Sequence, residues 1–173
     1  ASKGYEADGL LYLKSGSKEQ NILAKQGDDL RIDWGYFYMV AGKENTAYSV
    51  GNSTELRKNF VNGTLNSASL EGEDSNGNMA LVRSHGKVKN VTDKIMLGYD
   101  DIYSIQYFGT NLRPYWNSKG DRTIEAEMLA AYNEYDKLLA RCYAFDKKLM
   151  EDASAAGGKE YAELCALAYR QSI

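Results

Sequence analysis

The clearest pattern of hydrophobic and polar positions along the chain is an alternation over residues 28–41. Every second residue from Leu30 to Val40 is apolar or aromatic, and the positions between them include Arg31 and Asp33. A period of two is typical of a β-strand, because successive side chains point to opposite faces. Since one face of this strand is wholly apolar, we expect it to pack against another layer of the protein.

Several shorter apolar runs, separated by Gly, Asn and Ser, predict further strands. Short strands between turn residues are typical of an antiparallel β-sandwich. The segment 53–60 (STELRKNF) instead favours one or two helical turns opened by a Ser or Thr cap. The further strands are expected at residues 9–14, 46–50, 79–84, 93–99 and 102–108.

A helical period replaces the alternation after Asp121. Eight apolar residues are spaced alternately four and three positions apart, which is the seam of a heptad pattern. Apolar residues that widen the stripe favour a helical hairpin from a larger α-domain over a pure coiled coil. The seam consists of Ile124, Met128, Ala131, Tyr135, Leu138, Cys142, Phe145 and Leu149.

Capping residues mark the ends of this long helix. Asp121 or Thr123 can cap its start, and Gly157-Gly158 supplies a left-handed residue that ends it. Residues 159–173 form a second helix, with no glycine or asparagine to stop it. We therefore expect a helical hairpin, and we expect the chain to be part of a longer protein.

The composition of the chain changes near residue 113. Residues before this point are rich in Gly, Asn and Ser, whereas glycine is scarce from there to Gly157. We therefore predict an α+β fold with two domains. An antiparallel, β-sandwich-like region covers residues 1–112, and a long-helix hairpin covers residues 113–173.

The overall composition narrows the class of protein. With 43% hydrophobic residues and a net charge of -3, the chain is too apolar and too weakly charged for intrinsic disorder. Its mild acidity argues against a nucleic-acid binder. No stretch approaches the roughly 20 apolar residues that span a bilayer, so we expect no membrane span. The 14 tyrosines suit half-exposed sheets and binding surfaces, because each combines an apolar ring with a polar hydroxyl.

The two cysteines lie on the two predicted helices of the hairpin. Cys142 precedes Gly157 by 15 residues and Cys165 follows it by 8, so in an antiparallel hairpin their heights differ by about 10 Å. A disulfide needs a shorter separation, so we predict two free, buried thiols. Two cysteines and a single histidine cannot furnish a structural zinc site.

The single histidine, His85, follows Ser84. Imidazole is the usual base for a serine hydroxyl, so a Ser–His–carboxylate relay is one interpretation. Such relays assemble from residues far apart in the sequence, and local adjacency is no evidence of their geometry. A surface histidine at the end of a strand is therefore the favoured interpretation.

The acidic loop over residues 71–78 (EGEDSNGN) suggests a calcium site as one alternative. Asp74, Asn76 and Asn78 alternate as oxygen ligands would. An EF-hand needs glycine and glutamate where Met79 and His85 stand, so that motif fails. A solvated turn is favoured over an irregular calcium site, and calcium binding stays open.

The adjacent carboxylates Asp100 and Asp101 stand between two apolar runs. Paired carboxylates perform acid–base work when their surroundings separate their pKa values. Neighbouring residues of a strand point to opposite faces, so the two would share a site only if the chain turns there. A turn or cap role is favoured, and both residues are kept as weak candidates for substrate binding.

Four aromatic residues are candidates for a platform on which a sugar or another flat ligand stacks. Core packing is favoured for Trp34, because its whole strand face is apolar. Tyr115 and Trp116 follow Pro114, and we expect them to seal the join between sheet and helices. The four residues are Trp34, Tyr36, Tyr115 and Trp116.

Four longer strings of the sequence resemble the glutaminase A family. In that family a β-sandwich-like region precedes a catalytic domain built as an α/α toroid. The resemblance implies a secreted or cell-envelope hydrolase that converts L-glutamine to L-glutamate and ammonia without an organic cofactor. No metal ligand is assigned in this sequence. The strings are residues 27–36 (GDDLRIDWGY), 99–109 (YDDIYSIQYFG), 111–116 (NLRPYW) and 161–171 (YAELCALAYRQ).

The same resemblance implies that this chain carries only the first helical hairpin of the toroid. Most catalytic loops would then lie outside it, so no catalytic residue is assigned and the chain alone is expected to be inactive. Arg170, in the last matching string, has a guanidinium group that can hold a substrate carboxylate. A surface or interdomain salt bridge is the favoured role for Arg170.

Two other readings of the sequence stay open. A β-sandwich before an α/α toroid also resembles the layout of glucoamylase-type glycosidases, which makes a carbohydrate-active protein the alternative. An interaction module is the third reading. In it the 124–149 helix forms a homodimer and the sheet binds a partner. The other expected partners are the remainder of the parent chain and a second copy paired through open sheet edges.

Overall fold

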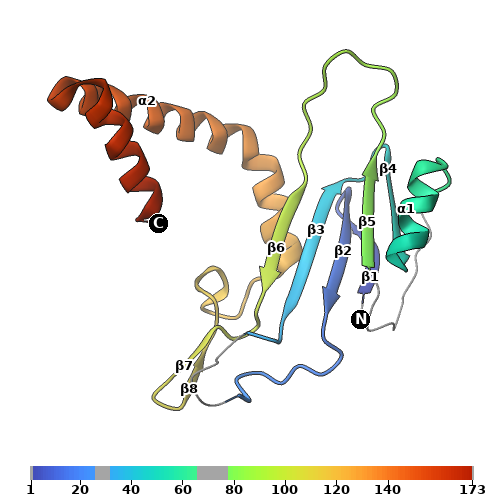
Figure 1. Cartoon of the computed structure of the whole chain (residues 1–173). Coiled ribbons are helices and arrows are strands. Elements are labelled where there is room, and N and C mark those ends of the chain that lie inside the picture. The colour runs from blue at the N-terminus through green and yellow to red at the C-terminus, as the bar shows by residue number, and fades with distance from the viewer. Residues whose placement is uncertain (1, 26–31, 66–77, 173) are drawn as a thin grey trace. The chain divides into compact units, whose positions relative to one another are not determined.

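A computed structural model of the chain describes residues 2–25, 32–65 and 78–172 (Figure 1). The chain divides into two compact units, Ala1–Leu129 and Ala130–Ile173. Antiparallel strands precede a long helix that ends near the C-terminus, so the predicted α+β fold class is confirmed.

The largest sheet has four strands in the order β1-β2-β3-β6, and every neighbouring pair is antiparallel. A two-residue turn joins the first two strands, with positive φ at both Asp8 and Gly9. Asp-Gly favours this turn because both positions need a left-handed backbone. The strands are β1 (Ser2–Ala7), β2 (Leu10–Gly16), β3 (Tyr36–Gly42) and β6 (Met96–Asp100).

Two further sheets have two antiparallel strands each. One consists of β4 (Thr46–Gly51) and β5 (Asn78–Arg83), and the other of β7 (Ile105–Tyr107) and β8 (Thr110–Leu112). The helical elements are α1 (Ser53–Val61), the 3-10 helix η1 (Tyr115–Asn117) and α2 (Ile124–Gln171).

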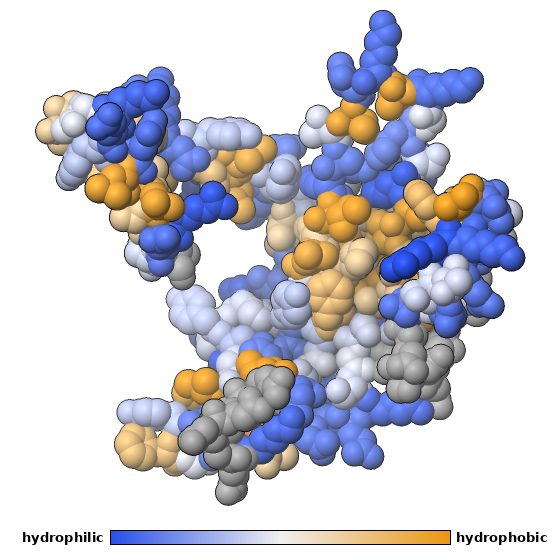
Figure 2. Space-filling view, in the orientation of Figure 1, coloured by the Kyte–Doolittle hydropathy of each residue, from blue (hydrophilic) through white to orange (hydrophobic). Residues whose placement is uncertain are grey.

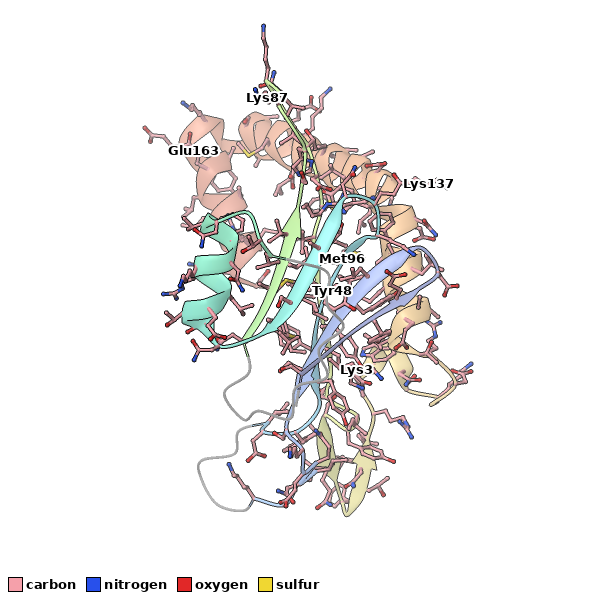
Figure 3. The ribbon with its side chains drawn as sticks, turned by 90° about the vertical axis from the view of Figure 1, so that its right-hand side faces the viewer. Lys3, Tyr48, Lys87, Met96, Lys137 and Glu163 are labelled. Carbon is pink, nitrogen blue, oxygen red and sulfur yellow. The ribbon has the colours of Figure 1, made fainter. Side chains whose placement is uncertain are left out.

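The core of the first unit lies between the four-stranded sheet and the β4–β5 sheet. Leu11 and Leu13 of β2 pack against Tyr48 and Val50 of β4, and all four are at most 6% exposed. Figure 3 shows Tyr48 among the side chains of this layer. The other face of the large sheet carries Tyr12, Tyr38 and Val40, each at most 2% exposed. Both faces of the sheet are therefore buried along its middle.

The first turns of α2 cover that second face. Ile124 and Met128 are 9% and 7% exposed and pack where Gly98 leaves room on β6. The hydroxyl of Tyr5 donates to Oε1 of Glu125 at 2.6 Å, and the hydroxyl of Tyr12 lies 3.3 Å from the Glu125 carbonyl oxygen. The start of α2 is thus hydrogen-bonded to β1 and β2.

The long alternating strand predicted over residues 28–41 is shorter than the pattern suggests. β3 begins at Tyr36, residues 32–35 form no strand, and residues 26–31 lie outside the described residues. Gly35 has a φ of 83°, a backbone conformation that interrupts a strand. The pattern holds from Tyr36 onward, where Tyr38 and Val40 share the buried face.

The remaining strand predictions agree with β2, β4, β5, β6 and β7 within a few residues, although β7 begins at Ile105 rather than at residue 102. Strands β1 and β8 were not expected. The helix α1 was expected, but the prediction that a Ser or Thr caps it is wrong. The side chain of Asn52, not Ser53 or Thr54, accepts the N–H of Thr54 at 2.9 Å.

The helical hairpin is present with the caps that the sequence predicts. The side chain of Thr123 accepts the N–H of Ala126 at 3.3 Å, and Gly158 (φ 80°, ψ -176°) interrupts α2. The interruption divides α2 into a first arm that ends at Gly157 and a second that runs to Gln171. The rings of Phe145 and Tyr169 lie 5.0 Å apart, so the arms pack against each other.

The cysteine prediction is half right. Cys142 and Cys165 are free, but Cys142 is exposed and Cys165 is half-buried. Other residues of the predicted seam are also exposed, since Leu138 and Phe145 are 52% and 45% exposed. Heptad spacing places these residues on one face, but it does not cover that face.

No helix within the described ranges combines the length and the apolar character that crossing a bilayer requires. The prediction that this chain has no membrane span therefore agrees with the described structure.

Candidate functional site

The candidate site is a pocket of about 520 Å³ at one end of the four-stranded sheet. It forms where β2 ends, where the chain enters β3 and where it leaves β6, so three distant parts of the sequence meet there. We call it the Trp34 pocket. It is lined by Ser15, Gly16, Ser17, Ile32, Asp33, Trp34, Gly35, Tyr36, Phe37, Tyr99, Asp100 and Asp101.

Trp34 fixes two loops of the pocket to each other. Its indole N–H lies 2.7 Å from the carbonyl oxygen of Asp101 and 2.8 Å from that of Tyr103, so it donates to both. The predicted core position of Trp34 is not what the structure has, because the residue is half-buried and lines the pocket. The apolar strand face that suggested core packing ends at Tyr36.

Gln20 holds the third loop in place. Its Oε1 accepts the N–H of Gly35 at 2.5 Å, and its Nε2 donates to the carbonyl of Ser17 at 2.8 Å. The hydroxyl of Ser17 in turn donates to the carbonyl of Asp33 at 3.1 Å. The pocket is therefore built mainly from side chains that satisfy loop backbone groups.

Asp100 and Asp101 both line this pocket, because the chain turns directly after them. The Asp100 carboxylate accepts the N–H of Ile102 at 3.1 Å, and the Asp101 carboxylate accepts the hydroxyl of Ser104 at 2.6 Å. Ile102 has a φ of 58°, which is unusual for a branched residue and marks the turn. The favoured turn role of the two carboxylates is confirmed.

A third carboxylate, that of Asp33, stands at the pocket. Asp33 lies directly before Trp34 in the chain. In the structure the ammonium of Lys25 lies 2.5 Å from Asp33, with the two side chains 54% and 40% exposed. Such an exposed pair contributes little to stability, so Asp33 adds mainly negative charge to the pocket.

The aromatic and acidic lining of this pocket lies inside a recognised sequence family. Residues 1–152 match the family described as a domain of unknown function (DUF5127). The chain belongs to the DUF5127 family. Neither the curated proteins nor the solved structures contain a significant match to it. The DUF5127 match includes every residue that lines the Trp34 pocket and part of the first arm of α2.

A cluster of tyrosines lies beside the pocket on the α2-facing side of the sheet. The Lys14 ammonium lies 3.7 Å from the centre of the Tyr36 ring and 5.5 Å from that of Tyr38. Burial lowers the pKa of Lys14, against the opposing effect of Glu125 and Asp100. The aromatic faces replace part of the water that the ammonium group loses.

The hydroxyls of this cluster are held in their neutral form. Burial raises the pKa of Tyr5, Tyr12 and Tyr38, and the nearby charge of Glu125 raises each of them further. Neutral phenols donate hydrogen bonds and do not act as bases at physiological pH. In the DUF5127 domain these tyrosines therefore anchor the start of α2 rather than supply a proton acceptor.

His85 lies beyond the end of β5, where a surface histidine was favoured. Its Nε2 is 3.2 Å from the Asp93 carboxylate, which also binds the guanidinium of Arg83. Burial acts to raise the pKa of Asp93, but hydrogen bonds from Arg83 and the Lys94 backbone, together with the charges of Arg83 and His85, lower it overall. The backbone N–H of Ser84 donates to the carbonyl of Asn45. This arrangement is that of an ion-pair cluster at a strand end.

Other sequence candidates lie elsewhere. Tyr115 is 97% exposed, so it does not seal a join between sheet and helices, while Trp116 is half-buried. Arg170 belongs to the second unit, where it lines a groove between the arms of α2. Asp100 and Asp101 thus share one pocket, and Arg170 is not part of it.

The suggested calcium loop is largely beyond the described residues. Asp74 and Asn76 fall in the segment 66–77, and Asn78 is the first residue of β5. Among the residues that the structure does describe, no three His, Cys, Asp or Glu side chains form a group that could hold a metal ion.

The sequence patterns did not identify Ser15 and Ser17, which line the pocket, or Gln20, which holds its loops. The bonds from Ser17 to Asp33 and from Gln20 to Gly35 join positions 16 and 15 residues apart, and no local pattern marks them. The missed strand β1 did carry one signal, because the dipeptide Asp8-Gly9 favours a two-residue hairpin turn.

Proposed function

We propose that this DUF5127 domain is a supporting, non-catalytic part of a glutaminase that hydrolyses L-glutamine to L-glutamate and ammonia. The sequence strings that resemble the glutaminase A family suggest this activity. By the same resemblance, the parent protein acts outside the cell or in the cell envelope. The domain match alone names no activity.

The observation that carries the proposal is the apolar face of the helical hairpin. Leu138, Leu164 and Leu167 are 52%, 62% and 54% exposed, and hydrophobic side chains are visible between the arms (Figure 2). A helix buries such a stripe against a neighbour in its working state. The first hairpin of an α/α toroid presents this stripe to the helices that follow it.

The hydrogen bonds and the ion pair of the pocket carboxylates favour a structural role for these residues over a catalytic one. Asp100 and Asp101 accept hydrogen bonds from their own loop, and Asp33 pairs with Lys25. A general base needs a lone pair directed at the substrate or its water. Asp100 and Asp101 instead stabilise the turn that follows β6.

The test compares the 173-residue chain with the full-length parent in an assay for ammonia released from L-glutamine. We expect release by the parent and none by the chain alone. The parent carrying Asp101→Asn should keep its kcat and lose thermal stability, since Asp101 is proposed to hold a turn. Turnover by the chain alone would contradict the supporting role. Inactivity of the folded parent toward glutamine would contradict the glutaminase assignment.

A carbohydrate-active parent is the second candidate, and the lining of the Trp34 pocket favours it. Trp34, Tyr36, Phe37 and Tyr99 place four aromatic rings beside carboxylates, and flat rings with nearby acceptors suit sugar faces and hydroxyls. A panel of glycosides offered to the same parent separates the two candidates. If a glycoside is turned over, Tyr99→Ala should weaken its binding, because Tyr99 is 68% exposed and its loss leaves the core intact.

A further inference from the structure

We propose that β6 is a pairing edge at which a second copy of this chain adds antiparallel, centred on Leu97, to form a homodimer. The strand order places β6 at one end of the four-stranded sheet, with β3 as its neighbour there. Among the described strands none pairs with the outer side of β6. The inference does not depend on the glutaminase assignment.

The side chains of this edge favour association. Ile95, Leu97 and Tyr99 are 50%, 61% and 68% exposed, and hydrophobic side chains gather over the sheets on the viewed side (Figure 2). Proteins usually protect an edge strand with lysine, proline or a bulge. The five residues of β6 (MLGYD) contain neither lysine nor proline.

The strand at the other edge of the sheet, β1, carries charged residues that protect it against pairing. β1 carries Lys3 and Glu6 within the strand, and Glu6 pairs with Lys43 at 2.6 Å. Tyr5 of the same strand is hydrogen-bonded to Glu125. Pairing of a second copy along β1 would have to accommodate charges in mid-strand, so β6 is the edge that remains.

The charges around β6 select the partner and the register. Lys94 precedes the strand and Asp100 ends it, so the sequence KIMLGYD has opposite charges at its two ends. In an antiparallel pair centred on Leu97, Lys94 of each copy lies opposite Asp100 of the other. Ile95 then lies opposite Tyr99, and Leu97 opposite its own counterpart. Opposite charges and aromatic–β-branched pairs are both favourable across strands.

A register centred on Gly98 is the competing arrangement. It would place Asp100 opposite Met96 and Asp101 opposite Ile95, which leaves both carboxylates without a cation. The Leu97 register satisfies two charge pairs by the two-fold symmetry alone. A second copy thus offers the complementary charges that an unrelated strand would have to match by chance.

Dimerisation in this register also concerns the Trp34 pocket. Tyr99 and Asp100 line that pocket and lie on β6. Lys94 of the second copy would stand beside Asp100, so each copy contributes a cation to the rim of the other copy's pocket. The dimer would therefore reduce the negative charge of the pocket.

A cysteine cross-link tests the register directly. In a chain with Cys142→Ser and Cys165→Ser, Leu97→Cys should give a covalent dimer under mild oxidation, because directly opposite Cα atoms are about 4.5–5.5 Å apart. Tyr99→Cys is the matched control. Its two copies would be about 14 Å apart along the strands and should not cross-link. Equal cross-linking of both variants, or none with Leu97→Cys, would overturn the proposal.

Sedimentation velocity of the chain without substitutions, with its thiols kept reduced, tests the association itself. A concentration-dependent dimer is expected, and Leu97→Lys should abolish it while Ile105→Lys, which changes a residue 54% exposed on β7, should not. Lys94→Glu should weaken the dimer about tenfold, since it places like charges opposite each other twice. Adding Asp100→Lys to Lys94→Glu should restore it. A monomer at every concentration, or a dimer unaffected by Leu97→Lys, would contradict the proposal.

Discussion

The two units of this protein use apolar residues in different ways. In the first unit Leu13 and Val40 are 0% exposed, because the four-stranded sheet is covered on both faces. In the second unit Leu138 and Leu164 are 52% and 62% exposed, although they also lie on regular apolar stripes. The same kind of pattern therefore marks a core that is complete in one region and a surface that lacks a cover in the other.

The small buried part of the second unit lies near its turn. Ala153 and Ala162 are 8% and 0% exposed on either side of Gly158, where small side chains let the arms approach closely. Away from the turn, contacts such as that between Phe145 and Tyr169 hold the arms together. Lys147 and Lys148 add exposed i,i+4 pairs to acidic residues, which contribute little. We infer that the first unit supplies most of the stability of the isolated chain.

The largest expected effect is a difference in stability between two variants, each with one leucine substitution in a different unit. Leu13→Ala should destabilise the first unit by about 2–5 kcal/mol, because it opens a cavity in a filled core. Leu138→Ala should change stability by no more than about 0.5 kcal/mol, because the side chain already meets water. Urea unfolding checks both variants. Tryptophan fluorescence reports the first unit, which holds Trp34 and Trp116, and far-UV circular dichroism reports the helices.

Similar losses in the two variants would contradict the contrast. They would mean that the stripe around Leu138 is buried in solution, for instance by self-association. Repeating the Leu138→Ala measurement in a Leu97→Lys background over a range of protein concentrations would identify that case. The β6 dimer is then absent, and any remaining dimer gains stability with concentration.

A smaller effect is expected from the loops that form the Trp34 pocket. Gly35→Ala should cost about 1–3 kcal/mol, because φ is 83° there and a Cβ would lie 2.5 Å from the Asp100 carbonyl oxygen. Gly51→Ala is the matched control, since a Cβ at Gly51 meets nothing within 4 Å. Thermal unfolding followed by tryptophan fluorescence measures both. A Gly35→Ala variant as stable as Gly51→Ala would show that the entry to β3 is not constrained as described.

The sequence predicted elements well where local pattern and packing agree. The short apolar runs of β2, β4 and β5 and the seam of α2 depend on neighbours within the same element, and these elements were found. The start of β3 was misplaced because Gly35 must approach the backbone of Asp100, a contact 65 positions away in the chain. Local alternation cannot report such a contact.

The candidate site was predicted only in part for the same reason. Asp100 and Asp101 were expected at a turn, since aspartate bonds to its own loop, and that local preference is what the structure has. Trp34 was placed in the core because its strand was assumed to continue. The thiol of Cys142 was expected to be buried because spacing identifies a face but not its cover. Predictions failed where tertiary contacts, rather than period, decide burial.

The smallest expected effect concerns pH and again singles out the first unit. Burial raises the pKa of Tyr12 and Tyr38, so the folded chain keeps phenol protons that the unfolded chain releases near pH 10. This stabilisation is fully present below pH 10 and is lost as pH rises toward the folded pKa. Each tyrosine contributes a slope of at most about 1.4 kcal/mol per pH unit. Lys14, whose pKa is lowered by burial, acts in the opposite sense below its unfolded value.

Tyr12→Phe isolates one tyrosine, because Lys14 is common to both proteins. The variant should lose stability less steeply than the parent when urea unfolding is measured at increasing pH above 10, by tryptophan fluorescence. At neutral pH it should lose about 0.5–1.5 kcal/mol with the hydrogen bond to the Glu125 carbonyl. Tyr115→Phe removes the same hydroxyl from a ring that is 97% exposed, and the slope should stay that of the parent. If the slope of stability against pH is unchanged in Tyr12→Phe, the Tyr12 hydroxyl reaches water in the folded chain. The first turns of α2 would then not close the second face of the sheet as described.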